Sequence, residues 1–386
     1  MTPTVITGKY NKAEVFTDSL ENEAASQIRA FLDHEAFAHG RIAIMPDVHA
    51  GKGAVIGFTA ALGDMVIPNV IGVDIGCGVR TWNIGERSVD FEALDRFIRS
   101  RIPSGRDVRR NAYEELEAAH ERIMDVPMRG GHREFRKRLT NAAKETEQDN
   151  ERVISSIGSL GGGNHFIEID RDEKGSLWLT IHSGSRNFGL RIATHHQAIA
   201  RKRSGSHSGL EFLTGDDREA YMRDMKTAQE YAALNRSVMG SIILSDFFKM
   251  RPDDAVSVES VHNYISFTDN IIRKGAISAH RDERVVIPFN MRDGLILGVG
   301  KGVKAWNLSA PHGAGRTMSR SRAKSEIKVD DFKKAMDGIW TSSVSRDTID
   351  ESPMAYKDAD SIIDALSDTV TVTSRMFPVY NFKAKD

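Results

Sequence analysis

Short apolar runs separated by glycine dominate residues 41–85, and this pattern predicts buried strands joined by tight turns. Strand-like patterns return at 164–183 and in the last third of the chain. Apolar positions recur at helical spacing at 217–238 and over much of 256–274, as they do at 330–338 and 361–367. The chain therefore alternates between groups of strands and blocks of helix.

Residues 89–156 combine long charged stretches with apolar positions at helical spacing, which predicts a mainly helical insertion. Strands in runs, broken by helical blocks without regular alternation, are typical of an α+β fold. No period of 20–50 residues repeats, and no linker divides the chain. We expect one catalytic domain over residues 1–386, with a complex mixed sheet and a helical insertion at about 89–156.

Composition supports a globular protein rather than a disordered or fibrous one: 40% of the 386 residues are hydrophobic and 28% are charged. No apolar run approaches the roughly 18 residues that a membrane span needs, and the polar N-terminal segment has no signal-peptide core. We therefore expect a cytoplasmic protein without a membrane partner.

The formal charge is −1, with 53 Lys and Arg against 54 Asp and Glu, so no global excess indicates nucleic acid. Basic residues nevertheless cluster locally. These clusters could follow an RNA backbone, or they could form solvated helix faces balanced by Glu114, Glu115 and Glu117. Their members are Arg96, Arg99, Arg101, Arg106, Arg109, Arg110, Arg133, Arg136, Lys137, Arg138, Arg201, Lys202 and Arg203.

Cys77 is the only cysteine, which excludes an intramolecular disulfide. A single cysteine is commonly a small buried apolar residue. Cys77 lies three residues after Asp74, in a glycine-rich turn that follows a predicted buried strand at 70–73. A carboxylate and a thiol at the end of a strand can converge on one ion. Both interpretations of Cys77 stay open at this point.

Two histidines occur in a predicted antiparallel hairpin, whose polar turn spans residues 171–176. If Asp170 lies opposite Leu177, then His165 lies opposite His182, and directly opposed Cβ atoms are about 5 Å apart. The pair could share a metal ion. It could also be a surface or hydrogen-bonded core pair, and a one-residue slip would separate the rings.

Two further histidines have less specific surroundings. His262 falls on the helical pattern of 256–274, where a histidine is commonly a packed or helix-face residue. His312 lies between small residues and is followed by Arg316, so a phosphate could approach the backbone there and bind the guanidinium. His312 could then act as a nucleophile, or it could be an ordinary turn histidine.

Taken together, these segments resemble the RtcB family of RNA-splicing ligases, which join an RNA 3′-phosphate or 2′,3′-cyclic phosphate end to a 5′-hydroxyl end. The resemblance extends from about Met45 to Lys383, and its blocks follow one another in the family's order. They are MPDVH at 45–49, GKG at 51–53, GVDIGCG at 72–78, LGGGNHFIE at 160–168, HSGSR at 182–186, ALNR at 233–236, HN at 262–263, RKGA at 273–276, GKG at 300–302, HGAGR at 312–316 and AYKD at 355–358.

The resemblance implies a site with two manganese ions, with the Cys77 thiolate bridging them. The choice of manganese comes from the family, because affinity alone would favour zinc for such a mixed ligand set. The implied metal ligands are Asp74, Cys77, His165, His182 and His262.

The resemblance also implies that His312 attacks GTP and becomes guanylylated, and that GMP then activates the RNA 3′-phosphate. The residues expected to contact the guanylate are Asn164, His165, Glu168, His262, Asn263, His312, Gly313, Ala314, Gly315, Tyr356 and Lys383. The expected partners are RNA with those ends and an archease-type activator, and a monomer is favoured.

This chain departs from the family where most members have a Pro-Gly-Ser-Met-Gly loop, since residues 288–294 read PFNMRDG. Bulky Phe289 and Arg292 cannot allow the close backbone approach that glycine allows. Two other functions remain as alternatives: a metal-dependent cyclic phosphodiesterase or phosphatase that does not ligate, and a catalytically silent RNA-binding protein.

Overall fold

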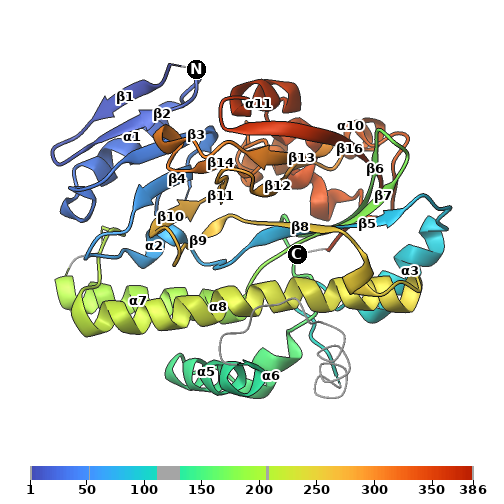
Figure 1. Cartoon of the computed structure of the whole chain (residues 1–386), viewed down its shortest axis with the longest axis horizontal. Coiled ribbons are helices and arrows are strands. Elements are labelled where there is room, and N and C mark those ends of the chain that lie inside the picture. The colour runs from blue at the N-terminus through green and yellow to red at the C-terminus, as the bar shows by residue number, and fades with distance from the viewer. Residues whose placement is uncertain (1, 52, 111–130, 206–207, 385–386) are drawn as a thin grey trace.

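The structure is a computed structural model that describes residues 2–51, 53–110, 131–205 and 208–384. Lys52 of the first GKG block and Glu114, Glu115 and Glu117 lie outside the described residues. The fold is α+β, as the strand and helix patterns predicted, with two mixed sheets stacked against long helices (Figure 1).

The larger sheet holds most of the buried strands of the second half of the chain. Its order is β12 (Arg284–Asn290), β13 (Gly294–Gly300), β16 (Val370–Lys383), β6 (Phe166–Asp172), β7 (Leu177–Ser183), β5 (Gly78–Gly85) and β8 (Ser257–Val261), and β15 (Trp340–Thr341) pairs with β16. The two end strands of this sheet approach each other, since the Val286 N–H of β12 donates to Ser260 Oγ of β8 at 3.0 Å. The sheet is therefore curled.

A second sheet is built mainly from the N-terminal segment. Its order is β1 (Thr4–Thr7), β2 (Lys12–Val15), β3 (Ile42–His49), β4 (Ile56–Ala61), β10 (Ile271–Lys274) and β9 (Asn263–Ile265). A two-stranded ribbon of β11 (Ala276–Ser278) and β14 (Ser309–Pro311) follows β10 in the chain. Because β10 and β9 follow β8 directly, the chain crosses there from the larger sheet to the smaller one.

Two long antiparallel helices, α7 (Arg186–Ser204) and α8 (Gly215–Ile242), run along one side of the sheets, and α5 (Gly131–Glu145) and α6 (Asn150–Ser155) lie beyond them (Figure 1). The buried side of α8 includes Tyr221, Met225, Ala228 and Tyr231, at the i, i+4, i+7 spacing of one helix face. The other helices are α1 (Asn22–Leu32), α2 (Pro68–Ile71), α3 (Phe91–Arg101), α9 (Arg320–Glu326), α10 (Val329–Ala335) and α11 (Ala359–Leu366).

Most predicted helices are confirmed. Those expected at 217–238, 330–338 and 361–367 correspond to α8, α10 and α11, and within the described part of 89–156 the chain forms α3, α5 and α6. None of the helices in the described ranges is both long enough and apolar enough to span a bilayer.

Two secondary-structure predictions were wrong. Residues 256–274 form strands β8, β9 and β10 and no helix, because Val258 and Ser260 alternate with more exposed neighbours and β-branched residues are frequent there. The strand expected at 70–73 is the end of helix α2, which Pro68 starts and Gly72 ends with a φ of +91°.

The register predicted for the hairpin was also wrong by one residue. Arg171 lies opposite Leu177, and His182 lies opposite Phe166 rather than His165. Asp172 causes the difference, since its side chain accepts hydrogen bonds from the backbone N–H groups of Lys174 and Ser176, which tightens the turn and extends β6 by one residue.

Candidate metal centre and active-site cavity

A cavity of about 750 Å³ collects nearly all of the predicted site residues, although they are far apart in the sequence. From the expected metal ligands it is lined by Asp74, Cys77, His182 and His262, and from the remaining set by Asn164, Glu168, Asn263, His312, Gly313, Ala314, Gly315, Tyr356 and Lys383. His165 does not line the cavity, but it lies directly behind Cys77 and Asp74.

Cys77 is positioned by a tight turn between α2 and β5. Gly76 adopts a φ of +72°, and a Cβ there would lie 2.9 Å from the Ala232 Cβ of α8. Glycine therefore satisfies both the left-handed backbone and the close packing. The Gly76 N–H donates to the Asn263 carbonyl at 2.7 Å, and the His262 N–H donates to the Cys77 carbonyl at 2.9 Å, so the backbone itself ties Cys77 to the β8–β9 junction.

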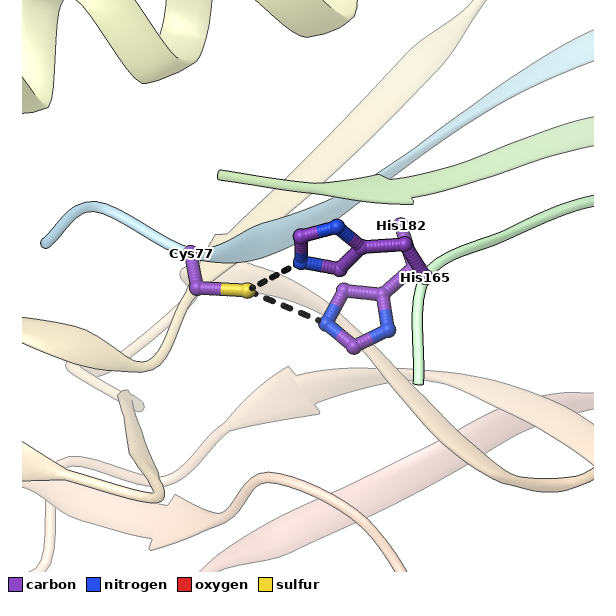
Figure 2. Close-up of side chains that lie close together, drawn as sticks. All are labelled: Cys77, His165 and His182. Carbon is purple, nitrogen blue, oxygen red and sulfur yellow. Dashed lines mark hydrogen bonds between the residues drawn. The ribbon is translucent and has the colours of Figure 1, made fainter. Parts of the chain in front are cut away.

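His165 and His182 point their Nε2 atoms at the Cys77 sulfur (Figure 2). The Cys77 Sγ atom lies 3.5 Å from His165 Nε2 and 3.3 Å from His182 Nε2. His165 precedes β6 and so escapes the strand's alternation, which explains why the two rings meet despite the register. Each ring is fixed through Nδ1, which lies 3.0 Å from the Leu160 carbonyl for His165 and 3.2 Å from the Asn164 carbonyl for His182.

Asp74 and His262 add one ligand atom on either side of this trio. Asp74 Oδ2 lies 3.0 Å from His165 Nε2, and His262 Nε2 lies 3.3 Å from His182 Nε2. The donor atoms thus form two groups, Asp74 with His165 and His182 with His262, and the Cys77 sulfur is next to both. The side chains of all five residues come together, as the predicted ligand set requires.

The cluster fits divalent metal ions chemically. Backbone carbonyls hold Nδ1–H on His165 and His182, which leaves the Nε2 lone pairs facing inward, as in many metal-binding histidines. Within the described ranges, Cys77, His165 and His182 form a group whose ligand atoms all lie within 4.8 Å of one another. Imidazole nitrogens that face each other at 3.3 Å need a proton or a cation between them.

Electrostatics agree with this assignment. Burial and the nearby Asp74 carboxylate raise the pKa of Cys77, so the thiolate requires a cation for its stabilisation. Burial followed by neighbouring imidazoles lowers the pKa of both His182 and His262, which keeps them neutral and able to bind a metal. Burial would raise the pKa of Asp74, but the combined effects of His165, Cys77 and His262 outweigh burial and lower it to about 2.

Two buried side chains of α8 hold the backbone beneath this cluster. The Arg236 guanidinium donates to the carbonyls of Gly76 and Ser183 at 2.8 and 2.7 Å, and Asn235 donates to Ser183 Oγ and to the Gly184 carbonyl. Both residues stand in the ALNR block at 233–236, from which no role was predicted for either. Their structural role is to fix the two segments that carry Cys77 and His182.

His312 lies beside the metal cluster, with its ring centroid 4.9 Å from that of His262. The fully buried Asp47 carboxylate accepts a hydrogen bond from His312 Nδ1 at 2.6 Å and another from the His312 backbone N–H at 3.2 Å. A carboxylate can only accept, so Nδ1 carries the proton and Nε2 keeps a free lone pair. Asp47 stands in the MPDVH block at 45–49 but was not predicted as a site residue.

A buried ionic network closes another part of the cavity. Glu351 binds the Lys383 ammonium at 2.9 Å and accepts a hydrogen bond from the Tyr356 hydroxyl at 2.7 Å. Burial would raise the pKa of Glu351, but Lys383 and Arg320 outweigh burial and lower it to about 2. Lys383 and Tyr356 were predicted from the sequence, whereas Glu351 was missed, and its place close before Tyr356 is the only sequence signal for it.

Comparisons with known proteins match this arrangement to one family. The family model described as tRNA-splicing ligase RtcB matches residues 28–384. The chain belongs to the RtcB family. RNA-splicing ligase RtcB of Escherichia coli strain K12 is 31% identical over 378 residues, covering 87% of this chain and 88% of that protein. The tRNA-splicing ligase RtcB of Aeropyrum pernix is 28% identical over 400 residues, covering 83% of this chain and 82% of that protein. Membership identifies the chain as an enzyme of a family of RNA ligases.

The unusual 288–294 loop of this RtcB-family chain is a hairpin turn between β12 and β13. Phe289 packs with Ala314 and Ile287, and Met291 packs with Phe332 and Ile349, so both large side chains are buried in apolar clusters. Asn290 binds Asp293 and closes the turn. Phe289 and Met291 nevertheless line the cavity, whereas Arg292 does not line it and binds Asp293 at 2.7 Å.

Most of the arginine clusters in this RtcB-family chain are paired with acids. Arg96, Arg99 and Arg101 bind Glu92, Asp95 and Asp246. Arg138, Arg201 and Arg203 likewise form ion pairs, and buried Arg109 donates to backbone carbonyls. These pairs favour the interpretation as balanced helix faces over an RNA-binding surface at these positions.

Proposed function

We propose that this RtcB-family enzyme joins an RNA 3′-phosphate or 2′,3′-cyclic phosphate end to a 5′-hydroxyl end and consumes GTP. The observation that carries the proposal is the position of His312, a histidine with one ring nitrogen held by a buried carboxylate and the other free, beside a cluster of metal ligands. A nucleophile that is oriented by an acid is typical of covalent catalysis.

Asp74, Cys77, His165, His182 and His262 would hold two manganese ions, with Cys77 shared between them. Bound there, the metals would offset negative charge on phosphate oxygens and lower the pKa of a water that opens a cyclic phosphate. The two groups of donor atoms on either side of the Cys77 sulfur support a shared thiolate.

His312 Nε2 attacks the α-phosphorus of GTP in the proposed first step. An N–P bond forms, the bond from phosphorus to the pyrophosphate oxygen breaks, and pyrophosphate leaves with the electron pair. The proton on Nδ1 stays in the hydrogen bond to Asp47, which stabilises the positive charge that develops on the ring.

Two transfers complete the proposed reaction. An oxygen of the RNA 3′-phosphate attacks the bound guanylate, the N–P bond breaks, and GMP becomes linked to the RNA end. The 5′-hydroxyl then attacks the phosphorus of the 3′-phosphate, loses its proton to solvent and expels GMP. The guanylate would contact Asn164, Glu168, Asn263, the 313–315 loop, Tyr356 and Lys383, all of which line the cavity. We further propose a cytoplasmic monomer that an archease-type activator assists.

The rival function is hydrolysis of RNA phosphate ends without ligation, which would need the metals and no oriented nucleophile. The ligation test uses two RNA strands, one with a 3′-phosphate and one with a 5′-hydroxyl, incubated with GTP and Mn²⁺. We expect a joined product from the wild-type protein and none from His312→Ala. Release of phosphate without joining, at equal rates in both proteins, would favour the hydrolase.

A further inference from the structure

Strand β6 places a second carboxyl group behind the Glu168 carboxyl that lines the cavity. Glu168 and Asp170 are two residues apart and so share one face of the strand. Both are buried, and Asp170 is inaccessible to solvent. Glu168 lines the cavity and Asp170 does not. The reaction proposed above uses Glu168 and leaves Asp170 without a role.

The hydrogen-bond donors around Glu168 and Asp170 do not satisfy all of their carboxyl oxygens. Asn381 of β16 donates to Glu168 Oε2, and Thr180 of β7 donates to Asp170 Oδ2 at 2.6 Å. Asp170 Oδ1 is buried and has no donor among the described residues. The two carboxyl groups lie within hydrogen-bonding reach of each other. Two ionised carboxylates can only accept, so this contact requires a proton.

Electrostatics favour a single shared proton. Burial raises the pKa of both groups, to about 6 for Asp170, and the negative charge of Asp170 and its hydrogen bond raise the pKa of Glu168 further. The positive charge of Lys383, on the same face of β16 as Asn381, favours one negative charge on the pair. The pair therefore holds one proton and one charge near neutral pH, as interacting carboxyl dyads do.

We propose that Asp170 is a positioning residue of the nucleotide site: it shares a proton with Glu168, and this hydrogen bond holds the Glu168 carboxyl in the cavity wall as an acceptor for the N–H groups of a guanine base. The inference rests on the proposed function, which supplies the guanine nucleotide. Without the shared proton, two like charges would face each other in a buried site, and Glu168 would rotate away from Asp170.

The first test is spectroscopic and needs no nucleotide. Infrared difference spectra between the wild type and Asp170→Asn at neutral pH should contain the carbonyl stretch of one buried protonated carboxylic acid. The same band should be lost in Glu168→Gln. A wild-type spectrum without this band would overturn the shared proton.

The second test measures GMP affinity by calorimetry in the presence of Mn²⁺. Asp170→Ala should weaken binding roughly five- to thirtyfold, because the hydrogen bond that positions Glu168 is lost. Asp170→Asn can donate the same hydrogen bond from its amide and should restore affinity to within about twofold of the wild type. Arg171→Ala, at an exposed position of the same strand, is the control, and it should bind GMP as the wild type does.

The outcomes separate the two proposals. Wild-type affinity in Asp170→Ala, or equally weak binding in Asp170→Asn and Asp170→Ala, would overturn the positioning role. A wild-type protein that fails to bind GMP while showing the infrared band would instead contradict the nucleotide step of the proposed function.

Discussion

At His312, one hydrogen bond decides which ring nitrogen can react. The Asp47 carboxylate is fully buried and accepts from Nδ1, so Nε2 is unprotonated whenever the ring is neutral. Asp47 also accepts the His312 backbone N–H, and this second bond fixes the direction of the side chain. The reactive tautomer is therefore set by a residue that lies 265 positions away in the sequence.

This arrangement predicts a large effect of Asp47→Asn on guanylylation. The amide can hold the wrong tautomer, and it no longer stabilises the positive ring, so the single-turnover rate should fall roughly 100- to 10,000-fold. Manganese content should stay unchanged, because Asp47 lies outside the ligand cluster. A rate within threefold of the wild type would show that Asp47 does not activate His312.

At the scale of elements, helices and strands were each predicted in part. Helix α8 was predicted, because apolar residues recur at helical spacing along it, whereas the 19-residue helix α7 was not. The segment 256–274 contains Val258, Val261 and Ile265, whose spacing fits a helix as well as short strands, and periodicity alone cannot distinguish the two.

The site was more predictable than its surroundings, because its residues stand in specific family-like motifs. The hairpin register was wrong and yet the two histidines meet, since His165 lies just outside the paired strand. Asp47, Glu351 and Asp170 were not predicted. Asp47 contacts His312 and Glu351 contacts Lys383, both far along the chain, and Asp170 accepts a hydrogen bond from Thr180 of the neighbouring strand. A single sequence does not record such contacts.

The turn after β7 gives a prediction at this scale. A Cβ at Gly184 would lie 2.1 Å from Asp74 Oδ1, so Gly184→Ala must displace the Asp74 carboxylate. We expect a folded protein that binds less manganese than the wild type, measured by equilibrium dialysis and elemental analysis. Cys77→Ala, which removes the thiol, is the reference for lost binding. Two tightly bound ions in Gly184→Ala would contradict the role of Asp74 as a ligand.

At the scale of the whole molecule, the site lies where the two sheets meet, at the β8–β9 crossing. Ion pairs near this crossing join the β9–β10 turn to β10 and to the residues that follow β11. Asp269, in the turn between β9 and β10, binds Arg273 at 2.7 Å and His280, which follows β11, at 2.9 Å. Burial would raise the pKa of Asp269, but Arg273, Ser266 and His280 together outweigh burial and lower it to about 2.

Because the pKa of Asp269 is lower in the folded protein than in the unfolded chain, the ionised carboxylate stabilises the fold above about pH 4. This contribution is lost as the pH falls toward 2. Part of this cluster faces solvent, which weakens its charge interactions. We therefore take about 1 kcal/mol as the contribution of Asp269 ionisation to the free energy of unfolding. Denaturant unfolding should show Asp269→Asn less stable than the wild type at pH 7, with the difference smaller by roughly half of that amount at pH 3. Asp360→Asn, in an exposed pair with Arg375, is the control and should change little at either pH. An Asp269 difference that is independent of pH would contradict the assignment.

The most direct test of the proposed reaction is transfer of the α-phosphate of GTP to the protein. The wild-type chain, incubated with α-labelled GTP and Mn²⁺, should acquire a label that is stable in alkali and labile in acid, as expected for a phosphoramidate. His312→Ala should acquire none. No label on the wild type, or equal label on His312→Ala, would contradict the account.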